Sequence, residues 1–136
     1  MGAAKAGAAK AGETIVCLDA TLRVEIFPAD LAATIDFYHR LGFEAVGGSD
    51  GYASLRYGAV RIGASESEPV DSSLRAVPAG TEIVIDVDDV RAVRDLVVGN
   101  GIELAADLVT RPWGLTDFRV NDPDGYYLRF TGRRES

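Results

Sequence analysis

The chain has 136 residues and a formal net charge of −7, which fits one domain and excludes a two-domain enzyme with a separate cofactor domain. The acidic balance argues against a nucleic-acid binder, which needs a basic face for phosphates. The single cysteine, Cys17, excludes an internal disulfide framework and a cysteine-rich zinc site. Since no apolar run approaches the roughly 20 residues of a membrane span, we expect a cytoplasmic globular protein with Cys17 buried.

The chain begins with a low-complexity segment. Residues 2–11 read GAAKA twice and contain both lysines, Lys5 and Lys10. We interpret residues 1–12 as a tail or leader and residues 13–136 as a single domain. Every cation of the domain is therefore an arginine, a residue that binds carboxylates through a planar fork of donors.

The first half of the domain predicts a strand, a helix and three further strands. Alternating residues predict a strand over 21–28, and Asp30 is a typical helix N-cap before apolar residues at helical spacing. Gly42 suits the turn after this helix. Short strands follow at about 43–47, 51–57 and 59–64.

The second half repeats this order at an offset of 59 residues, so that Asp89 corresponds to Asp30 and Gly101 to Gly42. It predicts strands over 81–87, 102–109, 114–121 and 126–131, with a tight turn at 122–125 between the last two. The sequence thus indicates an α+β fold of two βαβββ modules, about 20–64 and 81–132, joined by a linker over 65–80. Helices on one face of each curved sheet would leave the other faces to form a cleft.

Two motifs on this repeat resemble the vicinal oxygen chelate superfamily of glyoxalases, bleomycin-resistance proteins and extradiol dioxygenases. The first runs from Asp30 through Phe37-Tyr38 to Leu41-Gly42-Phe43. The second comprises Pro112-Trp113-Gly114, Asp117-Phe118-Arg119 and Asp122-Pro123-Asp124-Gly125, and is most similar to the bleomycin-resistance branch. The resemblance covers about residues 20–132 and implies the fold more strongly than the function.

The resemblance also implies four positions at which enzymes of the superfamily bind a divalent metal. Here they are Arg23, Arg61, Glu82 and Arg129. A guanidinium has no lone pair to donate and repels a cation, so we expect these positions to be degenerate, with no metal and no cofactor. A register slip of two residues would leave Glu25 and Asp86 as alternative ligands. His39, the only histidine, lies in the first helix, where we expect a solvated or capping role.

Strand alternation predicts which side chains face the cleft. Leu22, Val24 and Ile26 should face the helices, whereas Arg23, Glu25 and Phe27 should face the cleft. The candidate ligand-binding residues selected in this way, together with the cleft-lining motif, are Glu25, Phe27, Tyr52, Arg56, Asp86, Trp113, Asp117, Arg119 and Tyr127. One interpretation of the charged residues is an arginine–carboxylate network that joins the modules. The other is a ligand site in which carboxylates at the rim meet a cation and aromatic side chains stack on flat rings.

Three functional hypotheses follow. The first is a non-enzymatic protein that binds and sequesters a small aromatic, cationic natural product or antibiotic without a metal. The alternative is a glyoxalase- or dioxygenase-like lyase or isomerase with an atypical metal site or a carboxylate base. The third is an interaction module without a ligand. In each case the resemblance implies a homodimer whose paired modules complete the clefts.

Overall fold

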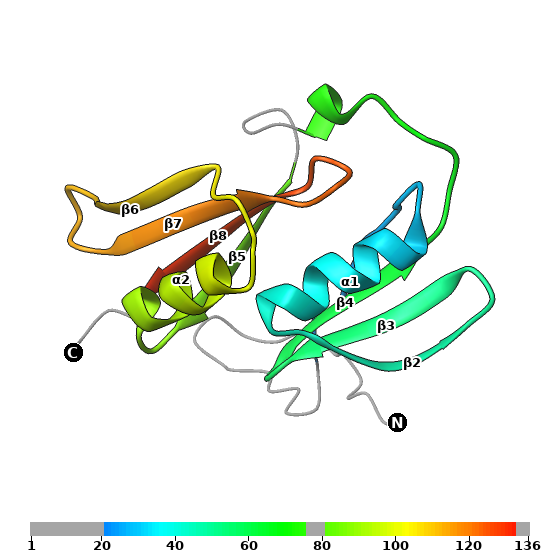
Figure 1. Cartoon of the computed structure of the whole chain (residues 1–136), viewed down its shortest axis with the longest axis horizontal. Coiled ribbons are helices and arrows are strands. Elements are labelled where there is room, and N and C mark those ends of the chain that lie inside the picture. Colours follow the sequence, from blue (N-terminus) through cyan, green and yellow to red (C-terminus); the bar gives the residue numbers. More distant parts are fainter. Residues whose placement is uncertain (1–20, 76–80, 133–136) are drawn as a thin grey trace, which may run out of the picture.

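A computed structural model describes residues 21–75 and 81–132, which form two modules with the same order of elements (Figure 1). The first module comprises β1 (Val24–Ile26), α1 (Leu31–Leu41), β2 (Glu44–Ser49), β3 (Tyr52–Tyr57) and β4 (Val60–Ser65). A short 3-10 helix, η1 (Ser72–Arg75), lies between the modules. The second module comprises β5 (Glu82–Val87), α2 (Val90–Gly99), β6 (Ala106–Thr110), β7 (Thr116–Asn121) and β8 (Tyr127–Gly132).

Both helices begin at the predicted aspartates. The side chain of Asp30 accepts a hydrogen bond from the backbone N–H of Ala33, and that of Asp89 accepts one from Ala92. At the end of α1, Gly42 adopts a φ of 118°, a left-handed conformation that a residue with a Cβ reaches only with strain. These local signals fix where both helices begin and where α1 ends.

Each module forms a four-stranded mixed sheet. The strand order is β1-β4-β3-β2 in the first sheet and β5-β8-β7-β6 in the second. The β1–β4 and β5–β8 pairs are parallel, whereas the remaining pairs are antiparallel. The equivalent connectivity explains the 59-residue repeat, and it places β1 and β5 at corresponding edges of the two sheets.

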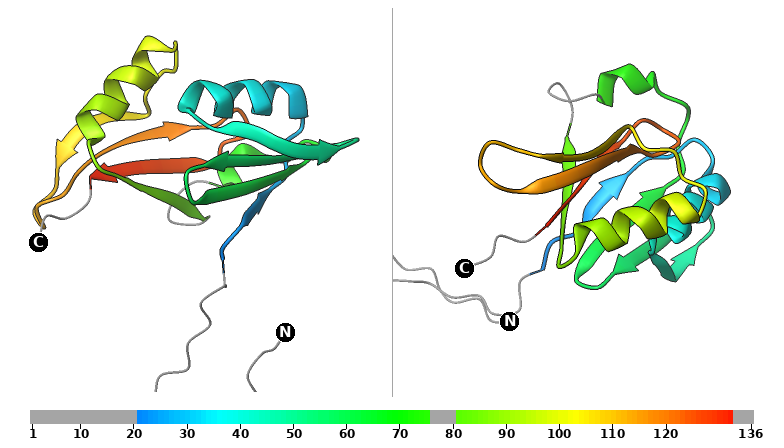
Figure 2. Two further views of the ribbon diagram at one scale, coloured as in Figure 1. Left: turned by 90° about the horizontal axis from the view of Figure 1, so that it is seen from below. Right: turned by 60° about the vertical axis from the view of Figure 1, so that its left-hand side comes forward.

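The two helices cover the same side of the molecule and leave the other side of both sheets without a helix (Figure 2). Ile26 and Ile62 are buried under the helix of the first module, and Phe118 and Phe130 stack in the second with ring centroids 5.0 Å apart. The buried apolar residues of both modules form one core. Side chains along each strand therefore alternate between the core and the open side of the sheet.

The modules meet where α1 packs against the turn between β7 and β8. The hydroxyl of Tyr38 donates a hydrogen bond of 2.8 Å to Asp122, which is buried. The backbone N–H of Ala29 donates to Asp124, and the hydroxyl of Tyr126 accepts a bond from the N–H of Phe27. The motif at 122–125 is therefore a turn that also holds the two modules together.

The predicted order of elements and the α+β fold are confirmed, with one correction. Leu22 was expected to face the helices, but it precedes β1 and is 78% exposed. The strand is only three residues long, so alternation does not extend back to this position. The tail over 1–12, Cys17 and the end of the linker at 76–80 lie outside the described residues.

Candidate functional site

The open face of the second sheet carries most of the polar residues predicted for the site. The strand register places Val84, Arg129 and Arg119 side by side across β5, β8 and β7. A second row contains Asp86, Thr131 and Asp117, and a third contains Glu82, Tyr127 and Asn121. Asp86, Asp117, Arg119 and Tyr127, four of the candidate ligand-binding residues, therefore lie in neighbouring rows of one sheet.

Asp117 is the most constrained charge on this face. It is only 1% exposed, and both of its oxygens accept hydrogen bonds from Arg111, at 2.9 and 3.0 Å. Arg119 donates a further bond to it at 3.2 Å and another to the hydroxyl of Tyr127 at 3.0 Å. The bonds from Arg111, supported by those from Arg119, hold the pKa of Asp117 below its ordinary value.

This arrangement changes the expected role of Asp117. The sequence placed it at the rim, where it would meet a cationic ligand. In the structure its charge is already neutralised by two guanidinium groups, so it orients Arg111 and Arg119 instead.

A cavity of about 550 Å³ lies at one end of this open face. Arg119, Asn121 and Tyr127 line it from the sheet, and Ser72 of η1 lines it from the linker. The linker is held there by Arg75, which donates to the carbonyl of Asp124 at 3.0 Å and lies 4.2 Å from the centroid of the Tyr126 ring. The cavity therefore combines hydrogen-bond donors with an aromatic ring, as small-molecule sites do.

The open face of the first sheet carries a smaller polar cluster. Glu25 accepts hydrogen bonds from Arg23 at 2.7 Å and from the hydroxyl of Tyr52 at 3.0 Å, both at the same oxygen. Partial burial of Tyr52, together with this bond, raises the pKa of its phenol. Gly63 lies opposite Glu25 in the register, and a Cβ there would collide with Tyr52 and Glu25. The cluster therefore depends on a glycine in the middle of β4.

The four positions that the resemblance implied for metal ligands have other partners among the described residues, or have none there. Glu82 pairs with Arg129 at 3.4 Å, whereas Arg23 pairs with Glu25. Arg61 Nη1 and Arg129 Nε are buried without a hydrogen-bond partner among the described residues. Three guanidinium groups and one carboxylate do not fit a divalent cation, and residues 21–75 and 81–132 contain no metal-binding cluster of His, Cys, Asp or Glu.

The predicted arginine–carboxylate network does not join the modules. Every ion pair among the described residues lies within one module, including Arg56 with Glu44 and Arg94 with Asp107. Hydrogen bonds and apolar packing connect the modules instead. His39 is exposed near the end of α1, away from the open faces, in keeping with a solvated role.

Four of the predicted ligand-binding residues are exposed, and one of them, Arg56, pairs with Glu44 on the neighbouring strand. Trp113 is 54% exposed at the tip of the β6–β7 hairpin, and Phe27 is exposed just after β1. Asp86 is exposed and borders a second cavity, of about 590 Å³, at the junction of the modules. Tyr57 and Val60 of the first module and Val84 of the second also line this cavity. Asp86 of the second module and Tyr57 of the first module therefore line the same cavity.

Sequence reasoning missed two contributors to the site. Arg111 was not selected, although its position in the Pro112-Trp113-Gly114 hairpin brings it across from Asp117. Ser72 was assigned to a linker, and its contact with the turn at Gly125 depends on long-range packing. Only the hairpin carried a usable signal, because residues 111 and 117 flank one tight turn. The register pairs Asp117 with Val109, so the contact also requires the long side chain of Arg111 to reach back along the strand.

No helix within the described ranges is long and apolar enough to cross a membrane. No curated protein matches the chain significantly in sequence. Residues 20–130 match the family model described as the glyoxalase/bleomycin resistance protein/dioxygenase superfamily.

Solved structures give the same result for the fold. A bleomycin resistance determinant encoded on the transposon Tn5 is 22% identical with a TM-score of 0.73, over 85% of this chain and 99% of that chain. A bleomycin-binding protein complexed with bleomycin is 24% identical with a TM-score of 0.68, over 85% and 98%. A protein of the same superfamily from Alicyclobacillus acidocaldarius is 20% identical with a TM-score of 0.73, over 86% and 93%. The chain therefore belongs to the glyoxalase/bleomycin resistance protein/dioxygenase superfamily.

Proposed function

We propose that this protein binds and sequesters a small aromatic, cationic natural product or antibiotic without a metal and without changing it chemically. The observation that carries the proposal is the chemistry of the open sheet faces, where arginines occupy the positions of the metal ligands and aromatic side chains remain accessible. Two structural neighbours are a bleomycin resistance determinant and a bleomycin-binding protein in complex with bleomycin, which supports a ligand of this kind.

The aromatic part of the ligand would contact exposed rings. Trp113 and Phe27 present large apolar surfaces to solvent, and Tyr127 lines the cavity next to η1. Rings of this kind stack on flat ligands and contribute about 0.5–1.5 kcal/mol each beyond the area they bury. Arg119 and Asn121 in the same cavity would bind acceptor groups of the ligand.

The cationic part of the ligand would meet Asp86. Asp117 is already paired with two arginines, and one oxygen of Glu25 is bonded to Arg23 and Tyr52. Asp86 is exposed and has no hydrogen bond or ion pair within the part of the chain that the structure describes. It also borders the cavity that Tyr57 lines from the first module. A cation held there would lie close to both a carboxylate and an aromatic face.

We further propose that a second copy of the chain covers the open faces, so that the functional unit is a homodimer. Apolar side chains accumulate on this side, including Val84 on β5, Phe27 after β1 and Val109 on β6. Among the described residues, β1 and β5 each pair with a strand on one side only. Sedimentation equilibrium should give twice the chain mass, and Val84→Asp should shift the protein towards the monomer. A wild-type protein that is monomeric at micromolar concentrations would contradict this assembly.

We also propose that the protein is located in the cytoplasm, because a chain with one cysteine has no internal disulfide framework of the kind common in secreted proteins.

The ligand proposal is tested by calorimetric titration with bleomycin and with cationic polycyclic antibiotics. At least one of them should bind, and Asp86→Asn should weaken its binding about tenfold, equivalent to about 1.4 kcal/mol. Asp50→Asn, at the exposed turn between β2 and β3, is a matched control that removes the same charge away from both cavities. The proposal fails if none of these compounds binds, or if the two variants weaken binding equally.

A further inference from the structure

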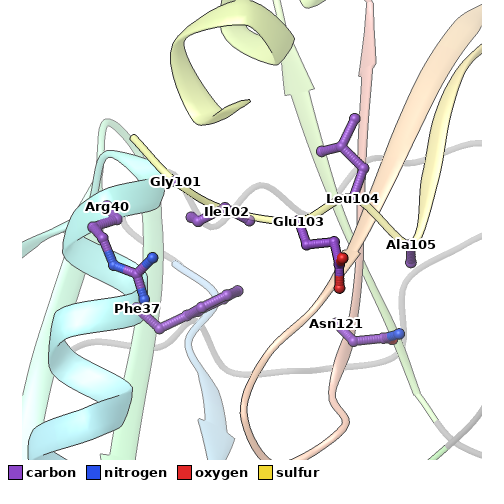
Figure 3. A pocket seen from close by; sticks show the side chains of 8 residues that line it. All are labelled: Phe37, Arg40, Gly101, Ile102, Glu103, Leu104, Ala105 and Asn121. Carbon is purple, nitrogen blue, oxygen red and sulfur yellow. The ribbon is translucent and has the colours of Figure 1, made fainter. Parts of the chain in front are cut away.

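A third cavity lies on the helix-covered side, where the end of α1 meets the loop between α2 and β6 (Figure 3). It has a volume of about 290 Å³, near the lower end of the range of about 300–1,000 Å³ typical of ligand pockets. Phe37 and Arg40 line it from α1, the loop contributes residues 101–105, and Asn121 lines it from β7. Its size restricts any ligand to a small molecule.

The cavity contains two opposite charges that do not neutralise each other. Arg40 bonds through Nε to Asp36 at 3.0 Å, which leaves its two terminal nitrogens available. Glu103 is exposed and forms no hydrogen bond or ion pair with any other described residue. In the view of Figure 3 the Phe37 ring lies between Arg40 on one side and Glu103 and Asn121 on the other. A ligand with both an acceptor and a donor could therefore bridge the two walls.

The remaining walls are suited to an apolar group. Phe37 and Ile102 are buried side chains of the core, and Leu104 packs against that core. The Arg40 guanidinium lies 6.0 Å from the centroid of the Phe37 ring, so the cationic and apolar walls adjoin. The side-chain amide of Asn100 bonds to the carbonyl of Arg40 at 3.1 Å and holds the end of α1 against the loop. The loop and the helix are thus fixed relative to each other around the cavity.

We propose that this cavity binds a free amino acid with an apolar side chain, whose carboxylate contacts Arg40, whose ammonium group contacts Glu103, and whose side chain lies on Phe37. An arginine fork matches the geometry of a carboxylate. Asn121 lines both this cavity and the one beside η1, but Arg40 and Glu103 line only this one, so the amino-acid site is tested through these two residues independently of the aromatic ligand proposed above.

The test is a titration with L-leucine followed by the amide chemical shifts of Gly101 and Ile102, neither of which lines the other two cavities. Leucine should bind in the millimolar range or tighter, whereas isocaproate, which lacks the amine, and isoamylamine, which lacks the carboxylate, should each bind at least about tenfold more weakly. Arg40→Gln and Glu103→Gln should each weaken leucine binding by a similar factor. Arg91→Gln and Glu68→Gln change exposed charges that do not line the cavity, and they should bind leucine like the wild type.

Two results would overturn the proposal. One is the absence of any saturable shift with leucine in folded wild-type protein. The other is binding that survives both Arg40→Gln and Glu103→Gln, or that is equally strong for the two analogues with a single charge. Because calorimetry with the aromatic cations reports on Asp86 and Trp113, failure at one site is distinguishable from failure at the other.

Discussion

The hydrogen bond between Tyr38 and Asp122 connects α1 to the β7–β8 turn, and Tyr38→Phe removes it with little change of shape. Tyr38 is fully buried, and its hydroxyl donates to Asp122 Oδ2 at 2.8 Å. The other oxygen, Oδ1, accepts from the backbone N–H groups of Asp124 and Tyr126, so Oδ2 loses its donor in the variant. Burial already raises the pKa of Asp122, which shows that its charged form is poorly solvated.

A hydrogen bond to a charged group contributes about 1.5–3 kcal/mol, and we expect a loss of about 2 kcal/mol in the free energy of unfolding. In urea unfolding this loss should lower the midpoint by about 1 M at an unchanged slope. Tyr57→Phe is the matched control, because the Tyr57 ring packs against Phe43 and Phe130 while its hydroxyl makes no hydrogen bond within the described part of the chain. The control should lie within about 0.5 kcal/mol of the wild type. Equal effects of the two variants would refute the assigned role of Tyr38.

Three further predictions follow from the site. The hydrogen bonds from Arg111 and Arg119 lower the pKa of Asp117 in the folded protein. Ionised Asp117 therefore stabilises the folded state at any pH above the pKa it has in the unfolded chain, and this contribution is lost as the pH falls through the pKa of the folded state. The destabilisation of Asp117→Asn in urea should therefore be large at neutral pH and shrink in acid, and a pH-independent difference would argue against the ion pairs. Gly125 has a φ of 88°, and a Cβ there would lie 2.6 Å from that of Ser72, so Gly125→Ala should lower the free energy of unfolding by about 1–3 kcal/mol and speed proteolysis near η1. Unchanged proteolysis would show that η1 does not depend on this contact. Because arginines occupy three of the four metal positions, prolonged dialysis against EDTA should leave the thermal midpoint unchanged, and a fall that zinc or another divalent metal restores would contradict the absence of a site.

The fold was predictable because local signals and the repeat agree. Asp30 and Asp89 cap the helices as their spacing indicated, and Gly42 ends α1 in the conformation that glycine favours. Alternation assigned the open face correctly for residues such as Arg119 and Tyr127, because one face of each strand is buried under a helix. It failed at Leu22, where no strand neighbour continues the ladder.

The site itself was only partly predictable, because side-chain partners depend on geometry that a single sequence does not contain. Alternation places Asp117 on the open face but does not show that Arg111 reaches across the hairpin and neutralises it. The packing of η1 beside Gly125 brings Ser72 next to a residue 53 positions later in the chain, and no local sequence pattern predicts this contact. The cavity between Phe37 and Glu103 likewise forms from two modules, whereas the sequence marked Phe37 only as part of the first motif.

The central claim is that the open faces bind an aromatic cation without a metal, and the fluorescence of Trp113, the only tryptophan, tests it most directly. Protein treated with EDTA would be titrated with the cationic antibiotics of the calorimetric panel. We predict saturable quenching with the same midpoint in the presence and absence of EDTA, and a midpoint about tenfold higher for Asp86→Asn. No quenching by any member of the panel, or quenching that requires an added divalent metal, would contradict the account.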